Sequence, residues 1–160
     1  MTDIKKIYIE EDLQINVNVR IEKINIKTGK IREIVETHNI ITDIALNMIR
    51  DRMLGTGTYN SFPTHLAVGT GTTAEVAGDT ALETEVFRDS LTQYVAVDTG
   101  QWQYKYYLSS DDANGNTISE AGLFDASSGG NMQARATFAG DDKTASEAWT
   151  FNWTFTLTRA

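Results

Sequence analysis

Between Ala148 and Thr158 the sequence alternates without interruption between large apolar and small polar side chains. Successive side chains of a β-strand point to opposite faces, so a period of two predicts a long strand with one apolar and one polar face. The apolar face is too hydrophobic to remain in water and must be covered by a second layer. The chain is therefore predicted to form a layered β structure whose core includes Trp149, Phe151, Trp153 and Phe155.

A second alternating stretch predicts a hairpin near the start of the chain. Apolar residues occupy odd positions in the first part of Leu13–Ile26, and the last two isoleucines of this stretch occupy even positions. This change of phase near Glu22–Lys23 indicates either a β-bulge or a strand that turns its other face inward. A turn containing Gly29 then leads to a returning strand at Ile31–Glu36.

One α-helix is predicted, from Thr42 to Leu54, because its apolar residues recur at spacings of three and four. Thr42 is the expected N-cap, Asp43 complements the positive end of the helix dipole, and Gly55 is placed to end the helix. We expect the helix to close one end of the β structure. Its predicted apolar face comprises Ile41, Ala45, Met48, Ile49 and Met53, and its solvent face Asn47, Arg50 and Asp51.

The remaining chain reads as short strands separated by loops rich in Gly, Asn and Asp. No repeating strand–helix alternation is present, which favours an antiparallel β-sandwich or a jelly-roll-like fold over a parallel α/β sheet. Because 160 residues suit one domain, residues 12–160 are predicted to form a single β-rich domain, preceded by an N-terminal arm at 1–11. The further strands are expected at His65–Val68, Val86–Val97, Trp102–Ser109, Ile118–Phe124, Met132–Phe138 and Ala148–Thr158.

Composition and charge exclude several classes of protein. The chain has no cysteine, which removes disulfides, thiolate metal sites and cysteine nucleophiles. It has no run of about 18 apolar residues, and its first eleven residues are charged, so we expect neither a membrane span nor a signal peptide. Of 14 basic and 22 acidic residues, nine of each precede Gly55, which leaves five basic against 13 acidic residues after it. Such an acidic β-rich part is expected to repel nucleic acid.

Two loops resemble ligand-binding motifs, but each has a structural interpretation. Gly69–Thr73 follows a strand, as phosphate-binding loops do, yet it lacks the Lys-Ser/Thr ending of a P-loop and no amphipathic helix follows. Asp111–Asn116 offers oxygen ligands at alternate positions, but in neither register does it supply both the glycine and the glutamate of an EF-hand. We interpret the first as a turn and the second as a hairpin loop, and predict no metal and no cofactor.

No catalytic constellation is evident in the sequence. The only histidines, His38 and His65, have no Ser/Asp pair near them in the sequence, so we interpret them as capping or surface residues. Neighbouring carboxylates suit a glycosidase in principle, but here they occur in polar, loop-like stretches where solvated charge is the usual role. We therefore predict that the chain is not an enzyme. The acidic pairs are Glu83 with Glu85 and Asp141 with Asp142.

Aromatic residues gather on the strand predicted at Trp102–Ser109. Trp102, Tyr104 and Tyr106 share one face with Leu108, which predicts a core face rather than a stacking platform for sugars or bases. Tyr107 lies on the opposite face and is the better candidate for an exposed contact.

Five blocks occur in a fixed order: Asn39–Asp51, His65–Thr73, Gly78–Leu82, Glu85–Arg88 and Ile118–Ala126. Together they resemble a family of tailed-bacteriophage virion proteins. Members are usually described as tail-fibre or minor tail proteins, and the layout is also similar to that of the β-sandwich decoration proteins that sit on phage heads as trimers. The resemblance extends from about Asn39 to Phe138, and the order of several blocks is more specific than any one alone.

This resemblance implies a structural role without catalysis, in a virion assembled in the cytoplasm of a bacterial host. A short chain without a collagen-like or coiled-coil shaft argues against a complete receptor-binding fibre. We therefore expect a capsid decoration (cement) protein that stabilises the head. A tail-fibre, minor tail or baseplate accessory protein is one alternative, and a carbohydrate-binding module for host attachment is another.

The expected partners are copies of the chain itself, as a trimer, and other virion proteins such as the major capsid protein, with no nucleic acid and no membrane. The arm mixes charged and apolar residues, and in a monomer such a tail would fray. On a particle it can order against a neighbouring subunit by adding to a sheet edge or a groove. The candidate subunit or virion contacts are Ile4, Ile7, Tyr8, Ile9 and Tyr107.

Overall fold

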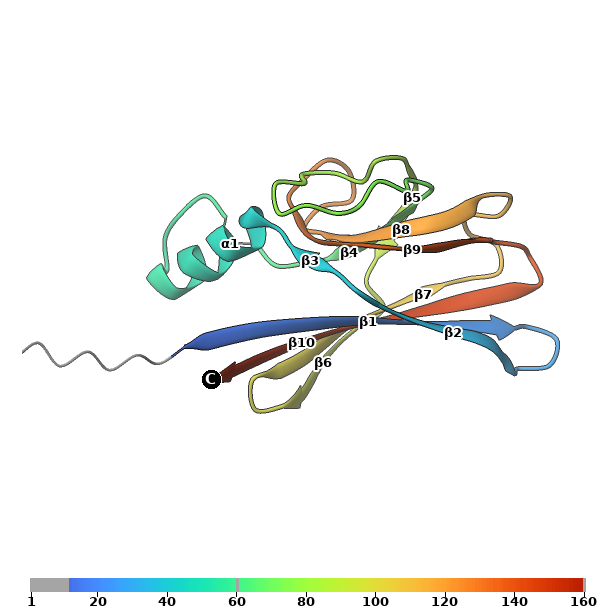
Figure 1. The fold of residues 1–160 in the computed structure, drawn as a ribbon, viewed down its shortest axis with the longest axis horizontal. Coiled ribbons are helices and arrows are strands. Elements are labelled where there is room, and N and C mark those ends of the chain that lie inside the picture. Colours follow the sequence, from blue (N-terminus) through green and yellow to red (C-terminus); the bar gives the residue numbers. More distant parts are fainter. Residues whose placement is uncertain (1–11, 60, 160) are drawn as a thin grey trace, which may run out of the picture.

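The computed structural model describes residues 12–59 and 61–159, which form two antiparallel five-stranded sheets packed face to face (Figure 1). Its elements are β1 (Leu13–Asn25), β2 (Ile31–His38), β3 (Ile40–Ile41), α1 (Asp43–Leu54), β4 (His65–Gly69), β5 (Glu85–Ser90), β6 (Gln93–Asp98), β7 (Gln101–Leu108), β8 (Thr117–Phe124), β9 (Met132–Asp142) and β10 (Glu147–Arg159). Sheet A has the strand order β2-β1-β10-β7-β6, and sheet B the order β3-β9-β8-β4-β5. The predicted antiparallel β-sandwich with one α-helix is therefore confirmed for the described residues.

The strand with the clearest alternation, β10, lies at the centre of sheet A. It pairs along its whole length with β1 on one side, and from Trp149 to Thr156 with β7 on the other. Its apolar side chains, from Trp149 to Phe155, are buried in the core between the sheets, while Thr154 and its neighbours on the other face are half-exposed. Both the strand and its buried face agree with the prediction.

The predicted hairpin is formed by β1 and β2, and their register shifts beside Lys23. β1 does not turn its other face inward, because Lys23 stays on the core side with only 1% of its surface exposed. Its ammonium group donates to Glu33 (2.9 Å) and Asp141 (2.7 Å) and lies 4.7 Å from the ring centre of Trp149. A buried, ion-paired lysine at an otherwise apolar position thus explains the change of phase in the sequence.

The single strand predicted at Val86–Val97 is wrong: the segment forms β5 in sheet B and β6 in sheet A. The break falls at Leu91 and Thr92, whose backbone N–H groups donate to Thr64 and to Lys105 in different sheets (2.8 Å each). These two hydrogen bonds carry the chain from one layer of the sandwich to the other. The segment contains no Gly, Pro or Asn, the residues that most often mark a turn, so its sequence does not clearly reveal the break.

Helix α1 has the predicted caps: Thr42 accepts the backbone N–H of Ala45 (3.3 Å), and Gly55 adopts a left-handed conformation (φ 67°). The predicted solvent position of Asp51 is wrong, because its exposed fraction is 3%. The loop after the helix folds back, so that Asp51 accepts the backbone N–H of Tyr59 (3.0 Å). This hydrogen bond is the main cause of the lowered pKa of Asp51. In the described part of the chain, no helix combines the length and apolar character needed to cross a membrane.

Candidate functional site

The glycine-rich loop after β4 binds carboxylates of its own chain. The backbone N–H of Gly71 donates to Glu120 (3.0 Å), and those of Thr72 and Thr73 donate to Glu83 (2.8 Å each). Hydrogen bonds from Thr73 are the main cause of the lowered pKa of Glu83. Because the donors that would cradle a phosphate already have acceptors, the loop has the geometry of a structural turn.

A buried ion pair lies beneath this loop, and neither of its residues, Glu120 and Arg135, is among the candidates proposed from the sequence. Glu120 is fully buried in β8 and accepts the backbone N–H groups of Glu83 (3.0 Å) and Thr84 (2.8 Å). It also pairs with the guanidinium of Arg135 (2.9 Å), which reaches Asp79 (2.8 Å) in the same loop. The network fastens residues 70–84 to sheet B. The sequence signal that could have identified this pair is a charged residue between small neighbours, as both Glu120 and Arg135 are.

Asp111–Asn116 is not a hairpin loop, because it joins β7 of sheet A to β8 of sheet B. Asp112 accepts the backbone N–H of Ser109 (2.9 Å), as in a capped turn. The ammonium group of Lys143 donates to Asn114 (3.1 Å), so a cation of the chain itself contacts this loop. Burial lowers the pKa of Lys143. Within residues 12–59 and 61–159, no group of three or more His, Cys, Asp or Glu side chains is placed to hold a metal ion.

The two histidines lie in different sheets. His38 is exposed at the end of β2 and does not cap the helix, a role that Thr42 has. His65 lies at the start of β4, where its ring nitrogens approach the hydroxyl groups of Thr64 (2.8 Å) and Ser90 (3.3 Å). No carboxylate among the described residues hydrogen-bonds this imidazole, so the Ser–His contact lacks the orienting group of a catalytic triad.

The paired carboxylates also have partners. Glu85 is bound by the guanidinium of Arg88 (2.9 Å), and Asp141 by the ammonium of Lys23 (2.7 Å). Asp142 accepts the hydroxyl of Thr117 (2.5 Å). These arrangements are those of structural ion pairs and turn contacts, and they do not present two carboxylates across a cleft as glycoside hydrolysis requires.

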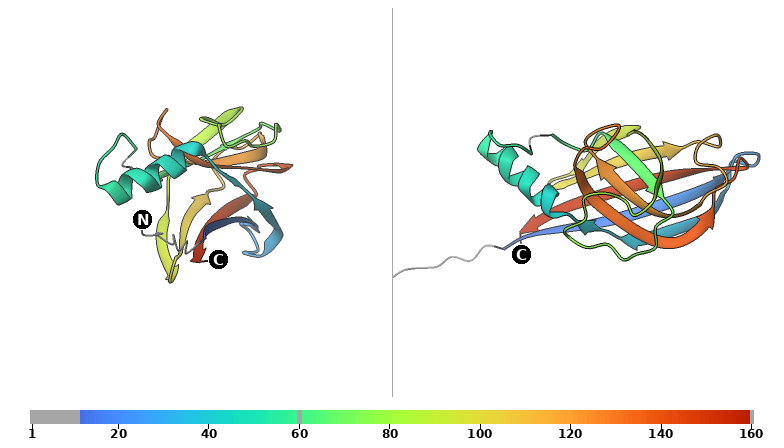
Figure 2. Two further views of the ribbon diagram at one scale, coloured as in Figure 1. Left: turned by 60° about the vertical axis from the view of Figure 1, so that its left-hand side comes forward. Right: turned by 90° about the horizontal axis from the view of Figure 1, so that it is seen from above.

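The described residues leave an apolar groove at the helix end of the sandwich. Inner-face residues of sheet A are fully buried near the centre, but Ile15, Trp102 and Tyr104 are only half-buried and Leu13 is 64% exposed. Helix α1 lies beside this end (Figures 1 and 2) and leaves a cavity of about 280 Å³, here called the end groove. The residues that define it include Ile15, Ile41, Met48, Ile49, Met53, Phe62, Trp102, Tyr104, Gln133 and Phe155.

Several residues of the end groove are exposed although they are apolar, because the described residues do not cover them. Met53 is 83% exposed and Phe62 half-exposed, although the sequence places Met53 on the apolar face of the helix. The amide nitrogen of Gln133 is buried without a hydrogen-bond partner among the described residues. Exposed apolar clusters of this kind are typical of surfaces that receive a partner.

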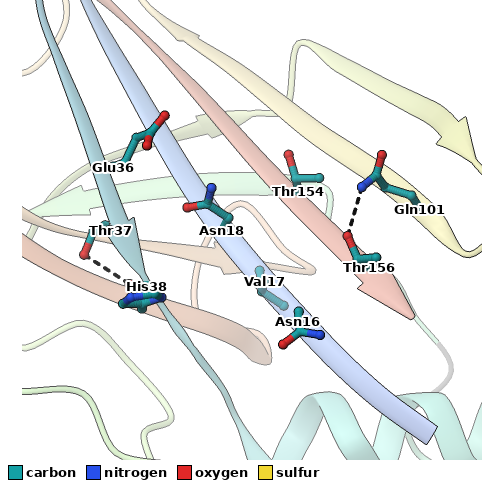
Figure 3. Close-up of a pocket in the computed structure, with 9 residues that line it drawn as sticks. All are labelled: Asn16, Val17, Asn18, Glu36, Thr37, His38, Gln101, Thr154 and Thr156. Carbon is teal, nitrogen blue, oxygen red and sulfur yellow. Dashed lines mark hydrogen bonds between the residues drawn. The ribbon is translucent and has the colours of Figure 1, made fainter. Parts of the chain in front are cut away.

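A second, polar hollow lies against the same part of β1. β2 pairs with β1 only from Asn18 to Ile24, and at His38 it leaves sheet A towards β3. Figure 3 shows the resulting notch, of about 620 Å³. Its lining combines amide, hydroxyl and imidazole groups, which both donate and accept hydrogen bonds. The lining residues are Asn16, Val17, Asn18, Glu36, Thr37, His38, Gln101, Thr154 and Thr156.

The predicted contact residues lie apart from these hollows or outside the described residues. Tyr107 is 47% exposed on the outer face of sheet A, opposite to the core face that Tyr106 and Leu108 occupy. The other four candidates, Ile4, Ile7, Tyr8 and Ile9, fall in 1–11, outside the described residues. Neither protein-family models nor curated proteins show a match to this chain.

Proposed function

We propose that the protein is a non-enzymatic structural subunit of a tailed-phage virion, and specifically a decoration protein that binds the head as a homotrimer. The observation that carries the proposal is that one segment of β1 both borders the exposed apolar end groove and has an edge that no described residue pairs with. Both features suit a subunit that is completed by its neighbours.

The positions of the five resembling blocks support the same proposal. His65–Thr73 contains β4, while Glu85–Arg88 and Ile118–Ala126 cover most of the adjacent strands β5 and β8 of sheet B. Glu120, within the last of these blocks, hydrogen-bonds the loop between the first two. Segments far apart in the sequence therefore form one structural unit, as expected if the resemblance reflects a shared fold and is not a set of chance matches.

Imaging of the assembled particle tests this proposal. We expect reconstructed virions that contain this chain to show density for it at regular three-fold positions on the capsid, and shells that lack it to melt at a lower temperature. Density at the tail tip or baseplate would contradict the decoration role and support the tail-fibre, minor tail or baseplate alternative. Absence of the chain from purified particles would contradict a virion role altogether.

A carbohydrate-binding module is a second candidate, and an exposed aromatic pair favours it. The rings of Phe62 and Tyr94 meet edge to face, with their centres 6.2 Å apart, and both are about half-exposed. Aromatic faces bind sugars through stacking contacts. If this role holds, the isolated domain should bind host glycans on an array, and Tyr94→Ala should abolish that binding while Tyr107→Ala leaves it unchanged. Equal binding by wild type and Tyr94→Ala would exclude the pair as a sugar site.

A further inference from the structure

Among the described residues, β1 has a pairing partner on only one side between Leu13 and Val17. β10 pairs with this stretch on one side, but the pairing with β2 begins only at Asn18. On the other side of Leu13–Val17, the structure therefore places no paired strand from the described residues. An open edge of this kind accepts an extended peptide, which forms backbone hydrogen bonds to the edge and alternates its side chains between the two faces.

The two hollows lie on the two faces that an added strand would occupy. Ile15 lines the end groove on the inner side, whereas Asn16 and Val17 line the polar notch. A strand that is added at this edge would direct every second side chain towards Ile15 and Ile41, and its other side chains towards the notch.

The chain itself contains a segment of the required chemistry. In 1–11, Ile7 and Ile9 are two positions apart and would share one face of a strand, with Lys5 and Lys6 before them and Glu10 and Glu11 after them. Eleven extended residues span roughly 36 Å, which is enough to cross to a neighbour and still pair with five residues.

A neighbouring copy is favoured over the same copy as the source of this segment. To reach the edge of its own β1, the segment would have to reverse at Glu10-Glu11-Asp12. A tight hairpin there favours glycine, asparagine or aspartate at positive φ, and the reversal offers only Asp12, without the glycine that usually follows such a residue. Three consecutive carboxylates in one turn would also repel each other.

We propose that residues 1–11 of one copy add as a strand to the Leu13–Val17 edge of a second copy and place Ile7 and Ile9 in its end groove. The inference rests on the proposed self-association and identifies the surface responsible for it. If each of three copies passes this segment to the next copy around a closed ring, every β1 edge and every end groove in the trimer is occupied.

Cysteine cross-linking tests the exchange directly, because the natural chain has no cysteine. A chain with Ile7→Cys and a tagged chain with Met53→Cys are co-expressed and treated with a short bismaleimide. Met53 is exposed, so this substitution leaves the core intact. We expect a linked product that contains one chain of each kind. The control pairs Ile7→Cys with Ile31→Cys, at the opposite end of β1 and β2 (Figure 1), and should give at least tenfold less product.

A double variant, Ile7→Asp with Ile9→Asp, is expected to weaken trimer formation by at least about a hundredfold, measured by light scattering, because each isoleucine loses an apolar contact. Equal cross-linking in the Ile31→Cys control, or an unchanged oligomer in the double variant, would overturn the inference. A chain that carries both Ile7→Cys and Met53→Cys and links only within itself would show that the segment binds its own copy. Particle imaging tests the virion role separately, so an exchanged trimer that is absent from particles would refute that role alone.

Discussion

Trp153→Ala is expected to lower the free energy of unfolding by about 3–5 kcal/mol, because removal of a large buried side chain leaves a cavity that the two sheets cannot fill. Trp153 is fully buried at the centre of β10, where it pairs with Val19 of β1 and Tyr104 of β7. Urea unfolding followed by far-UV circular dichroism measures the change. A loss below about 1 kcal/mol would show that this face of β10 is not part of the core.

Two further variants separate cavity formation from other effects at this position. Trp153→Phe keeps most of the volume and removes an indole nitrogen that has no hydrogen-bond partner among the described residues, so its loss should be well below that of Trp153→Ala. Thr158→Ala, on the exposed end of the same strand, should change stability by less than about 0.5 kcal/mol. Similar losses for all three variants would indicate a general weakening of β10 instead of a cavity.

The sequence predicts those parts of the fold that neighbouring residues determine. Alternation in Ala148–Thr158 reflects the two faces of one strand, and each residue contributes independently to that pattern. The caps of α1 are equally local, because Thr42 and Gly55 act within one turn of the helix ends. The fold class follows from several such elements considered together, so it was predictable from the sequence.

Features that depend on contacts between distant segments were not predictable in this way. Asp51 falls on the polar side of the helix by spacing, but the returning loop buries it. Val86–Val97 contains no Gly, Pro or Asn to mark a turn, and the backbone hydrogen bonds from Leu91 and Thr92 direct its two halves to different sheets. Glu120 and Arg135 form an ion pair only because of the register of β8 against β9, and the spacing of residues in the sequence gives no information on that register.

The end groove was also beyond sequence analysis, for a geometric reason. The pattern of α1 predicts an apolar face that closes the sandwich, and Ala45 and Met48 are indeed buried. Whether the helix fills the space depends on how far sheet A extends beyond sheet B. β1 and β10 of sheet A have 13 residues each, whereas β4 of sheet B has five. Part of the inner face of sheet A therefore extends beyond the strand of sheet B that would cover it. Met53 consequently remains exposed on a face that the sequence marks as apolar.

The second large effect is expected for Glu120→Leu, which should lower the free energy of unfolding by about 3–5 kcal/mol, as is typical when one partner of a buried ion pair is removed. The substitution leaves the guanidinium of Arg135 with Asp79 as its close partner. It also removes the acceptor of three backbone N–H groups, those of Gly71, Glu83 and Thr84. The hydrogen bond to Gly71 is buried, and a buried donor without an acceptor costs about 1–3 kcal/mol. Chemical denaturation measures the total.

The double variant Glu120→Leu with Arg135→Leu distinguishes ion pairing from loop anchoring. In Glu120→Leu, the guanidinium keeps Asp79 and the carbonyl of Thr73 as partners. If this incompletely paired cation causes most of the loss, the double variant should be more stable than Glu120→Leu alone, because the buried cation is removed as well. The hydrogen bonds to Gly71 and Thr84 are absent in both variants, so both should show faster amide hydrogen exchange at these positions than the natural chain. A double variant no more stable than Glu120→Leu would mean that Arg135 packs favourably without its partner. Slow exchange retained at Gly71 would mean that other contacts hold the loop at 70–84, such as those of Glu83 to Thr72 and Thr73.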